Sequence, residues 1–208
     1  MKLKKLLALT LAGAVLTVSL TACTPLDAAE LLYDWLFGGG SSNASRGNDM
    51  GLAESETLEE NIIRWFGLNN ATRKKDVAEP ILQEAAKSFD PGSWYNEKGE
   101  LNGTAKAVLD TIVQDKLTAN RLPMYTFVDV WEVQSSPTDF PPSESRLLYE
   151  DLYSRSGNGA TTDAPTHSSY MRSYSVVKGW MQSTYTSNVY AGVFQKNGKT
   201  YAAMVIIW

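Results

Sequence analysis

The spacing of hydrophobic and polar positions changes along this chain, from a helical period in its first part to a strand-like pattern towards its end. Apolar residues recur every three or four positions in 57–66, 75–89 and 104–117, which predicts three amphipathic helices. Thr57 and Glu60 form a capping box at the start of the first of these. Pro80 falls inside the second helix and is expected to break or restart it, because proline has no N–H to donate.

Later segments are rich in aromatic residues. Residues 124–133 are mostly β-branched or aromatic and predict a strand with both faces partly apolar. Residues 143–153 predict a short helix. Residues 168–182 predict a further helix, which carries Tyr174, Val177 and Trp180 on one side.

The C-terminal segment carries the clearest structural pattern. Residues 188–195 and 199–208 predict two strands joined at Asn197-Gly198, because Asn-Gly supplies the two positive φ angles of a type I′ turn. The last strand is apolar at successive positions, so both of its faces are expected to be buried. With several helices upstream, we predict an α+β fold, namely a three-layer α/β/α sandwich with an antiparallel sheet and a C-terminal β-hairpin.

The N-terminus has the pattern of an export signal. Lys2, Lys4 and Lys5 precede an apolar run of about 15 residues, shorter than the roughly 20 that cross a bilayer. The string Leu20-Thr21-Ala22-Cys23 resembles the lipobox of bacterial lipoproteins, which implies that Cys23 carries lipid on the extracytoplasmic face of a bacterial cell membrane. A chance cysteine after a plain signal peptide, or a retained membrane anchor, is the alternative.

These patterns divide the chain into three parts. Residues 1–22 are the predicted lipoprotein signal peptide. Residues 23–56 contain the lipidation site, a short amphipathic helix at 26–37 and a flexible Gly/Ser/Asn-rich linker at 38–49. The short helix could lie on the membrane or pack on the domain. Residues 57–208 form a single predicted globular α/β domain, long enough for a full core.

The order of helix, short link and hairpin resembles the CAP superfamily, the SCP/PR-1-like domains. The segment 176–183 (Val-Val-Lys-Gly-Trp-Met-Gln-Ser) is similar to the family's helix that ends in Trp-Met-x-Ser, and 188–194 is similar to its Gly-Val strand. The resemblance covers 176–208 and implies a CAP-like fold. The histidines and glutamates of the family's cavity are absent here, so the resemblance does not extend to metal-dependent activity.

Charge and residue counts limit the possible functions. The chain has 19 basic and 23 acidic residues, a net charge of −4, and no basic cluster, which argues against nucleic acid as a partner. Cys23 is the only cysteine and His167 the only histidine, so neither a disulfide nor a zinc site with several His or Cys ligands is expected. We predict no cofactor, no metal and no catalytic residue.

The aromatic side chains are the remaining indication of function. We predict a non-catalytic binding module whose cleft lies near Trp180, Tyr185 and Tyr190, with His167 as a further candidate. Its ligand would be a peptide, a glycan or a lipid, in addition to the membrane reached through the lipid anchor. Core packing is the competing explanation for the aromatic residues, and a surface position for His167. The alternative function is a cell-envelope hydrolase, acting on peptidoglycan or peptide, that uses His167.

Overall fold

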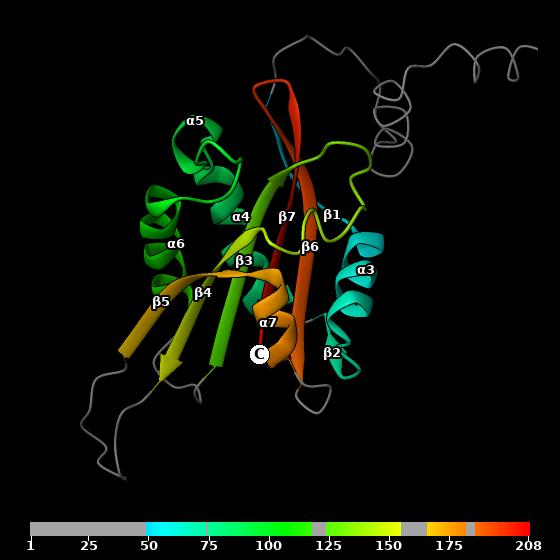
Figure 1. Cartoon of the computed structure of the whole chain (residues 1–208), viewed down its shortest axis with the longest axis vertical. Helices are drawn as coiled ribbons and strands as arrows, with labels where there is room; N and C mark the ends of the chain where they lie inside the picture. The colour runs from blue at the N-terminus through cyan, green and yellow to red at the C-terminus, as the bar shows by residue number, and fades with distance from the viewer. Residues whose placement is uncertain (1–48, 74, 118–123, 155–165, 182–185) are drawn as a thin grey trace, which may run out of the picture. The chain divides into compact units, whose positions relative to one another are not determined.

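An antiparallel sheet with helices packed against it makes up the part of the chain that the computed structural model describes (Figure 1). The described residues are 49–73, 75–117, 124–154, 166–181 and 186–208. Cys23, the predicted helix at 26–37, the linker and Tyr185 lie outside them. The elements, labelled as in Figure 1, are β1 Met50–Glu54, α3 Glu56–Phe66, β2 Ala71–Thr72, α4 Lys75–Ser88, α5 Pro91–Trp94, α6 Gly103–Lys116, β3 Met124–Glu132, β4 Leu147–Ser154, β5 Thr166–Ser173, α7 Tyr174–Trp180, β6 Ser187–Lys196 and β7 Lys199–Ile207.

The strands follow the order β1-β6-β7-β3-β4-β5, and every neighbouring pair on this path is antiparallel. The two-residue strand β2 pairs with β6 in parallel. The predicted hairpin is confirmed: β6 and β7 pair around Asn197 and Gly198, whose φ angles are 53° and 74°. β7 lies centrally between β6 and β3, and its residues 201–207 are buried, which explains why it is apolar on both faces.

Side chains from helices reach both faces of the sheet. On one face, Phe89 after α4 packs against Phe194 and Tyr201 of the hairpin, with ring centroids 5.5 and 4.7 Å away. On the other, Tyr174 of α7 reaches β3 and β7, with its hydroxyl 2.8 Å from Oδ2 of Asp129 and 3.9 Å from Sδ of Met204. The α+β class, the antiparallel sheet and the C-terminal hairpin are confirmed, whereas complete helical layers on both faces, as in a three-layer sandwich, stay a prediction.

The prediction of a short helix at 143–153 is wrong, because residues 147–154 form the strand β4. Glu150 and Asp151 suggested the solvated face of a helix, but both are buried. Adjacent residues of a strand point to opposite faces, and each carboxylate finds a partner on β5, Arg172 for Glu150 and His167 for Asp151. Pairing with a later strand therefore stabilises a charged segment that would not be a strand by itself.

The predicted helix at 168–182 is also wrong in its first half. Residues 166–173 form the edge strand β5, and only Tyr174–Trp180 is helical. β5 follows β4 in register from Leu147↔Ser173 to Ser154↔Thr166. From Thr166 to Met171, exposed side chains alternate with partly buried ones, as expected for a strand with one face against the protein.

Three details in the N-terminal half of the chain differ from the sequence-based expectation. Helix α3 is capped by Ser55, whose side chain accepts a hydrogen bond from the N–H of Leu58, and not by Thr57. Helix α4 continues through Pro80, and its apolar side facing the core, Ala78, Ile81, Leu82 and Ala85, is fully buried. The sheet begins at β1, ahead of the predicted domain start at residue 57. There Gly192 of β6 lies so close to β1 that a Cβ would sit 2.3 Å from the carbonyl oxygen of Ala53.

Candidate functional site

The guanidinium of Arg146 occupies an open edge of the sheet. Strand β3 pairs with β4 only as far as Val128↔Tyr149, although β3 continues to Glu132. The backbone carbonyl of Val130 therefore has no partner on β4. It accepts hydrogen bonds from Arg146 Nη2 at 2.7 Å and from the phenol of Tyr95 at 3.0 Å instead. Because a buried carbonyl without a donor is costly, these two side chains take over the role of the missing strand.

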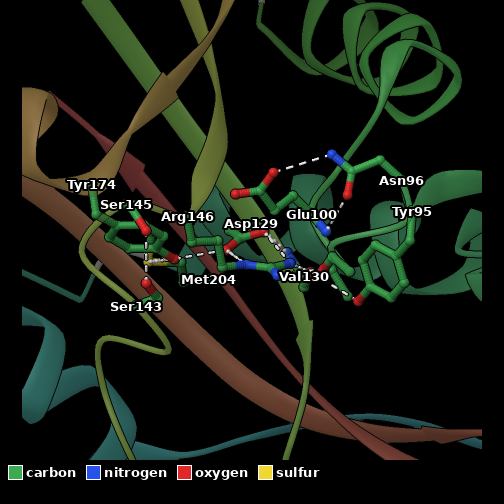
Figure 2. A network of polar contacts seen from close by, with 11 residues as sticks. Tyr95, Asn96, Glu100, Asp129, Val130, Ser143, Ser145, Arg146, Tyr174 and Met204 are labelled. Carbon is green, nitrogen blue, oxygen red and sulfur yellow. Dashed lines mark hydrogen bonds and ion pairs between the residues drawn. The ribbon is translucent and has the colours of Figure 1, made fainter.

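Arg146 is held in this position by a buried polar network, which Figure 2 shows. Its Nε and Nη2 donate to the two carboxylate oxygens of Asp129, at 2.8 and 3.3 Å. Its Nη1 donates to the carbonyl of Gly99, on the turn between α5 and α6, at 2.5 Å. Tyr174, the first residue of α7, donates its hydroxyl to Asp129 at 2.8 Å. The network joins β3, α7 and the α5–α6 turn across the edge of the sheet.

The charges in the network are strongly coupled. Burial raises the pKa of Asp129, while the charge of Arg146 and the hydrogen bonds from Arg146, Tyr174 and the Val130 N–H oppose that rise. Burial acts to lower the pKa of Arg146, but the nearby carboxylate of Asp129 outweighs it and the pKa of Arg146 is raised. Burial and Asp129 also raise the pKa of Tyr174 well above 10, so it remains a hydrogen-bond donor at any physiological pH.

A cleft of about 430 Å³ opens directly beside Arg146. It lies between the α5–α6 turn, the end of β3 and the segment that leads into β4. Tyr95, which is partly exposed, supplies aromatic surface, and Trp131, 3% exposed, forms part of the wall. The polar groups come from Lys98, Glu100, Glu132, Gln134, Ser143 and Ser145. Gln134, Lys98 and both serines are exposed, whereas Arg146 is 8% exposed and forms part of the cleft wall. Small-ligand sites combine concavity, aromatic walls and a few fixed polar groups in this way.

A second hollow of about 390 Å³ lies between β1 and α4. It is lined by Asp49, Met50, Gln83, Lys87 and Phe194, among others. It holds one aromatic residue, and its charged residues form ion pairs at its rim, such as Lys196 with Asp49 at 3.0 Å. It has no buried polar group comparable to Arg146, so we regard the cleft beside Arg146 as the better candidate site.

The cleft predicted near Trp180, Tyr185 and Tyr190 stays a prediction, and the structure describes two of these three residues. Trp180 lies in α7 and is 40% exposed. Tyr190 is 3% exposed and belongs to the core cluster on the other face of the sheet, where burial raises its pKa to about 12. Tyr185 is outside the described residues. Trp180 and Tyr190 therefore cannot contact one ligand, and Tyr190 is explained by core packing.

His167 has an acidic partner, contrary to the expectation of a plain surface histidine. Its Nδ1 lies 2.8 Å from Oδ2 of Asp151, and its side chain is 15% exposed. Asp151 is fully buried, and burial raises its pKa although His167 acts to lower it. Nearby on the same face of β5, Ser169 accepts a hydrogen bond from Lys106 Nζ at 2.6 Å, and Lys106 also pairs with Asp110 at 3.0 Å.

Sequence patterns do not reveal the cleft beside Arg146. Its residues come from separate segments, 95–100, 131–134 and 142–146, and form no local motif. The one available signal was Trp131, which belongs to the aromatic residues that suggested ligand binding. Within the described residues, no three or more His, Cys, Asp or Glu side chains gather as a metal site, and no helix is long and apolar enough to span a membrane.

Comparisons with known proteins give no family assignment. No family model matches the chain, and neither the search of curated proteins nor that of solved structures finds a match. The resemblance to CAP domains therefore stays a prediction, and the argument for function depends on the geometry of the site.

Proposed function

We propose that this protein is a lipid-anchored module on the extracytoplasmic face of a bacterial cell membrane, and that it binds a cell-envelope glycan in the cleft beside Arg146. The anchor is inferred from the lysines at 2, 4 and 5, the apolar run after them and Cys23. The glycan is inferred from the cleft. Its combination of the partly exposed Tyr95 ring with several polar side chains is the observation that carries this proposal.

The lining of the cleft suits a ligand with many hydroxyl groups. The carboxylates of Glu100 and Glu132 can accept hydrogen bonds from hydroxyls, and Gln134 and Lys98 can donate to them. Tyr95 is partly exposed and offers amphipathic ring surface to the C–H face of a sugar, whereas Trp131 is buried. The volume of about 430 Å³ is within the range of small-ligand sites, about 300–1,000 Å³.

The floor of the cleft is rigid before any ligand binds. Asp129, Val130 and Gly99 already hold the guanidinium of Arg146, and Tyr95 is fixed by its bond to Val130. A site whose groups are ordered in advance loses less conformational entropy when it binds a ligand. This arrangement supports binding more than catalysis, because Arg146 donates its hydrogen bonds to Asp129, Gly99 and Val130 and is therefore not free to act on a substrate.

Soluble disaccharide fragments of peptidoglycan are expected to bind the purified full chain, measured by isothermal titration calorimetry. Lys98→Ala and Gln134→Ala are each expected to weaken binding about tenfold, the equivalent of one lost hydrogen bond of about 1–1.5 kcal/mol. Both residues are exposed, so their removal should leave the fold intact.

The matched control is Lys87→Ala, an exposed lysine that lines the other hollow. Its affinity should equal that of the wild-type chain. If the peptide part of peptidoglycan binds saturably without its sugars, the ligand is a peptide and not a glycan. Absence of binding to either, or equal weakening by Lys87→Ala and Lys98→Ala, would contradict the proposed site.

A second candidate function is hydrolysis of peptidoglycan or peptide with His167 as general base. The 2.8 Å contact between His167 Nδ1 and the buried Asp151 favours it, because a carboxylate that orients one ring nitrogen leaves Nε2 to take a proton from water. Oδ1 of Asp151 and the hydroxyls of Thr126 and Tyr153 are buried and have no hydrogen-bond partner among the described residues.

This candidate predicts that the full chain releases soluble fragments from purified cell-wall material. His167→Gln is expected to lower that rate at least about 100-fold, the usual contribution of a general base. Ser168→Ala is the control, because Ser168 neighbours His167 in β5 and its side chain points to the opposite face of the sheet. Release no faster than that of a blank without protein would exclude the hydrolase.

A further inference from the structure

Exposed apolar side chains gather at one place on the described surface. Within the described residues, four large hydrophobic side chains are exposed, and three of them lie together on β5 and α7: Tyr170, Val176 and Trp180, at 46%, 41% and 40%. Val176 and Trp180 are four residues apart on α7 and therefore share a side of this helix. Tyr170 and Trp180 are linked by Arg172, whose Cζ lies 4.5 and 5.4 Å from their ring centroids. We call these residues, with Arg172 and with Lys178 on the opposite side of the helix, the α7 surface.

Two cations are part of the α7 surface and are held by it. Arg172 Nε donates to Glu150 at 2.8 Å, and Glu150 is 3% exposed, so a buried carboxylate holds the guanidinium on its protein side. Lys178 Nζ lies 4.2 Å from the ring centroid of Trp65 on α3 and is exposed. Because Glu150 is covered and already paired, the exposed groups here are the aromatic rings, Val176 and the two cations, with Glu144 beside the first turn of α7.

We infer that the α7 surface lies against the headgroups of an anionic phospholipid bilayer. Trp and Tyr prefer the interface between water and lipid, where an apolar ring meets a polar edge. Lys and Arg beside them attract lipid phosphates. Val176 adds an aliphatic group that favours the boundary of the acyl chains.

Other occupants fit less well. Two copies of this surface would bring Arg172 and Lys178 against their equivalents, and like charges disfavour such a contact. Neither of the two clefts described above is lined by Tyr170, Val176 or Trp180, and sites for small ligands such as sugars are concave. A bilayer accepts the aromatic rings and the cations together.

The anchor makes this contact geometrically possible, so the inference rests on the lipid-anchor part of the proposed function. Residues 24–49 separate Cys23 from β1. The predicted linker at 38–49 has 12 residues and, as a flexible chain, would reach about 20 Å on average, at about 5–6 Å times the square root of their number. A domain tethered at that distance meets the membrane constantly, and even weak attraction at the α7 surface would then select one orientation.

The experiment uses the full wild-type chain in vesicles of phosphatidylglycerol and phosphatidylcholine whose acyl chains carry bromine, a short-range quencher of tryptophan. The wild-type chain is compared with Trp180→Phe, and the difference in quenching isolates Trp180 from the other tryptophans, including Trp35 near Cys23. We expect quenching of Trp180, reduced at least about fivefold by Lys178→Glu, because the loss of one cation near an anionic surface weakens binding by about that factor and the new carboxylate adds repulsion.

Lys87→Glu is the matched control, since Lys87 is exposed on α4 and away from the α7 surface. It should leave the quenching of Trp180 unchanged. Equal quenching of the wild-type chain and Trp180→Phe, or equal effects of Lys178→Glu and Lys87→Glu, would overturn the inference. Mass spectrometry of the same samples reports the lipid on Cys23 separately. A lipidated chain in which Trp180 is not quenched would refute the membrane contact of the α7 surface alone. An unlipidated chain in which Trp180 is quenched would refute the lipid anchor alone.

Discussion

Replacing Arg146 by methionine is expected to lower the free energy of unfolding by about 3–5 kcal/mol, the usual cost of breaking a buried ion pair from one side. Methionine keeps much of the side-chain volume but leaves the carboxylate of Asp129 buried without its charged partner. The carbonyls of Gly99 and Val130 lose a donor at the same time. Urea denaturation followed by far-UV circular dichroism measures the change.

Two further variants separate the charge from the packing. In the double variant Asp129→Leu with Arg146→Met no buried charge remains, so it is expected to be more stable than Arg146→Met alone. Lys199→Met removes an ion pair with Glu132 that solvent reaches, and should change stability far less. A loss for Arg146→Met no larger than that for Lys199→Met would show that the network contributes little to folding.

The same substitution tests the site. Arg146 fixes the α5–α6 turn to β3, and both line the cleft. Arg146→Met is therefore expected to weaken glycan binding through disorder of the cleft, even under conditions in which the chain remains folded. Lys98→Ala, in contrast, removes a ligand contact and should leave the unfolding midpoint where it is.

Phe89→Ala is expected to lower the free energy of unfolding by about 3–5 kcal/mol, the range for deleting a buried aromatic ring. Phe89 is 1% exposed and contacts four rings edge-on: Trp94, Tyr95, Phe194 and Tyr201, with centroids 5.3, 5.5, 5.5 and 4.7 Å away. Its removal leaves a cavity between the helices α4 and α5 and the hairpin β6–β7. Thermal and urea denaturation both report the loss.

Phe89→Leu is the control, because leucine fills most of the cavity and should cost clearly less than alanine. If the two variants unfold at the same urea concentration, the cost does not come from a cavity. Since Tyr95 contacts Phe89 and lines the cleft, Phe89→Ala is also expected to weaken ligand binding more than Phe89→Leu does.

Much of the fold could be predicted where it depends on near neighbours in the chain. Asn197-Gly198 determines a type I′ turn by itself, and the successive apolar residues of 201–207 correctly predict a strand buried on both faces. Helices α3, α4 and α6 follow the spacing of their apolar side chains. The helix predicted at 143–153 fails for the opposite reason, because Glu150 and Asp151 can be buried in a strand only when β5 supplies Arg172 and His167.

The candidate site could not be predicted because none of its contacts is local. Arg146 looks like an ordinary charged residue in a polar segment, and it is buried only because Asp129 and Gly99, 17 and 47 positions away, accept its hydrogen bonds. The aromatic residues show the opposite case, in which residues close in the sequence are separated by the fold. Tyr190 and Trp180 were grouped by their nearness in sequence, but the sheet places Tyr190 in the core and leaves Trp180 on the surface.

The sequence by itself determined the hairpin, the amphipathic helices and the α+β class, and it predicts the lipid anchor at Cys23. These depend on patterns of residues that are neighbours along the chain. The tertiary structure alone decided that β4 and β5 are strands, that Arg146 and Asp129 meet at an open sheet edge, and that a cleft forms beside them. A buried charge needs a partner brought from far along the chain, and only the packed fold brings it.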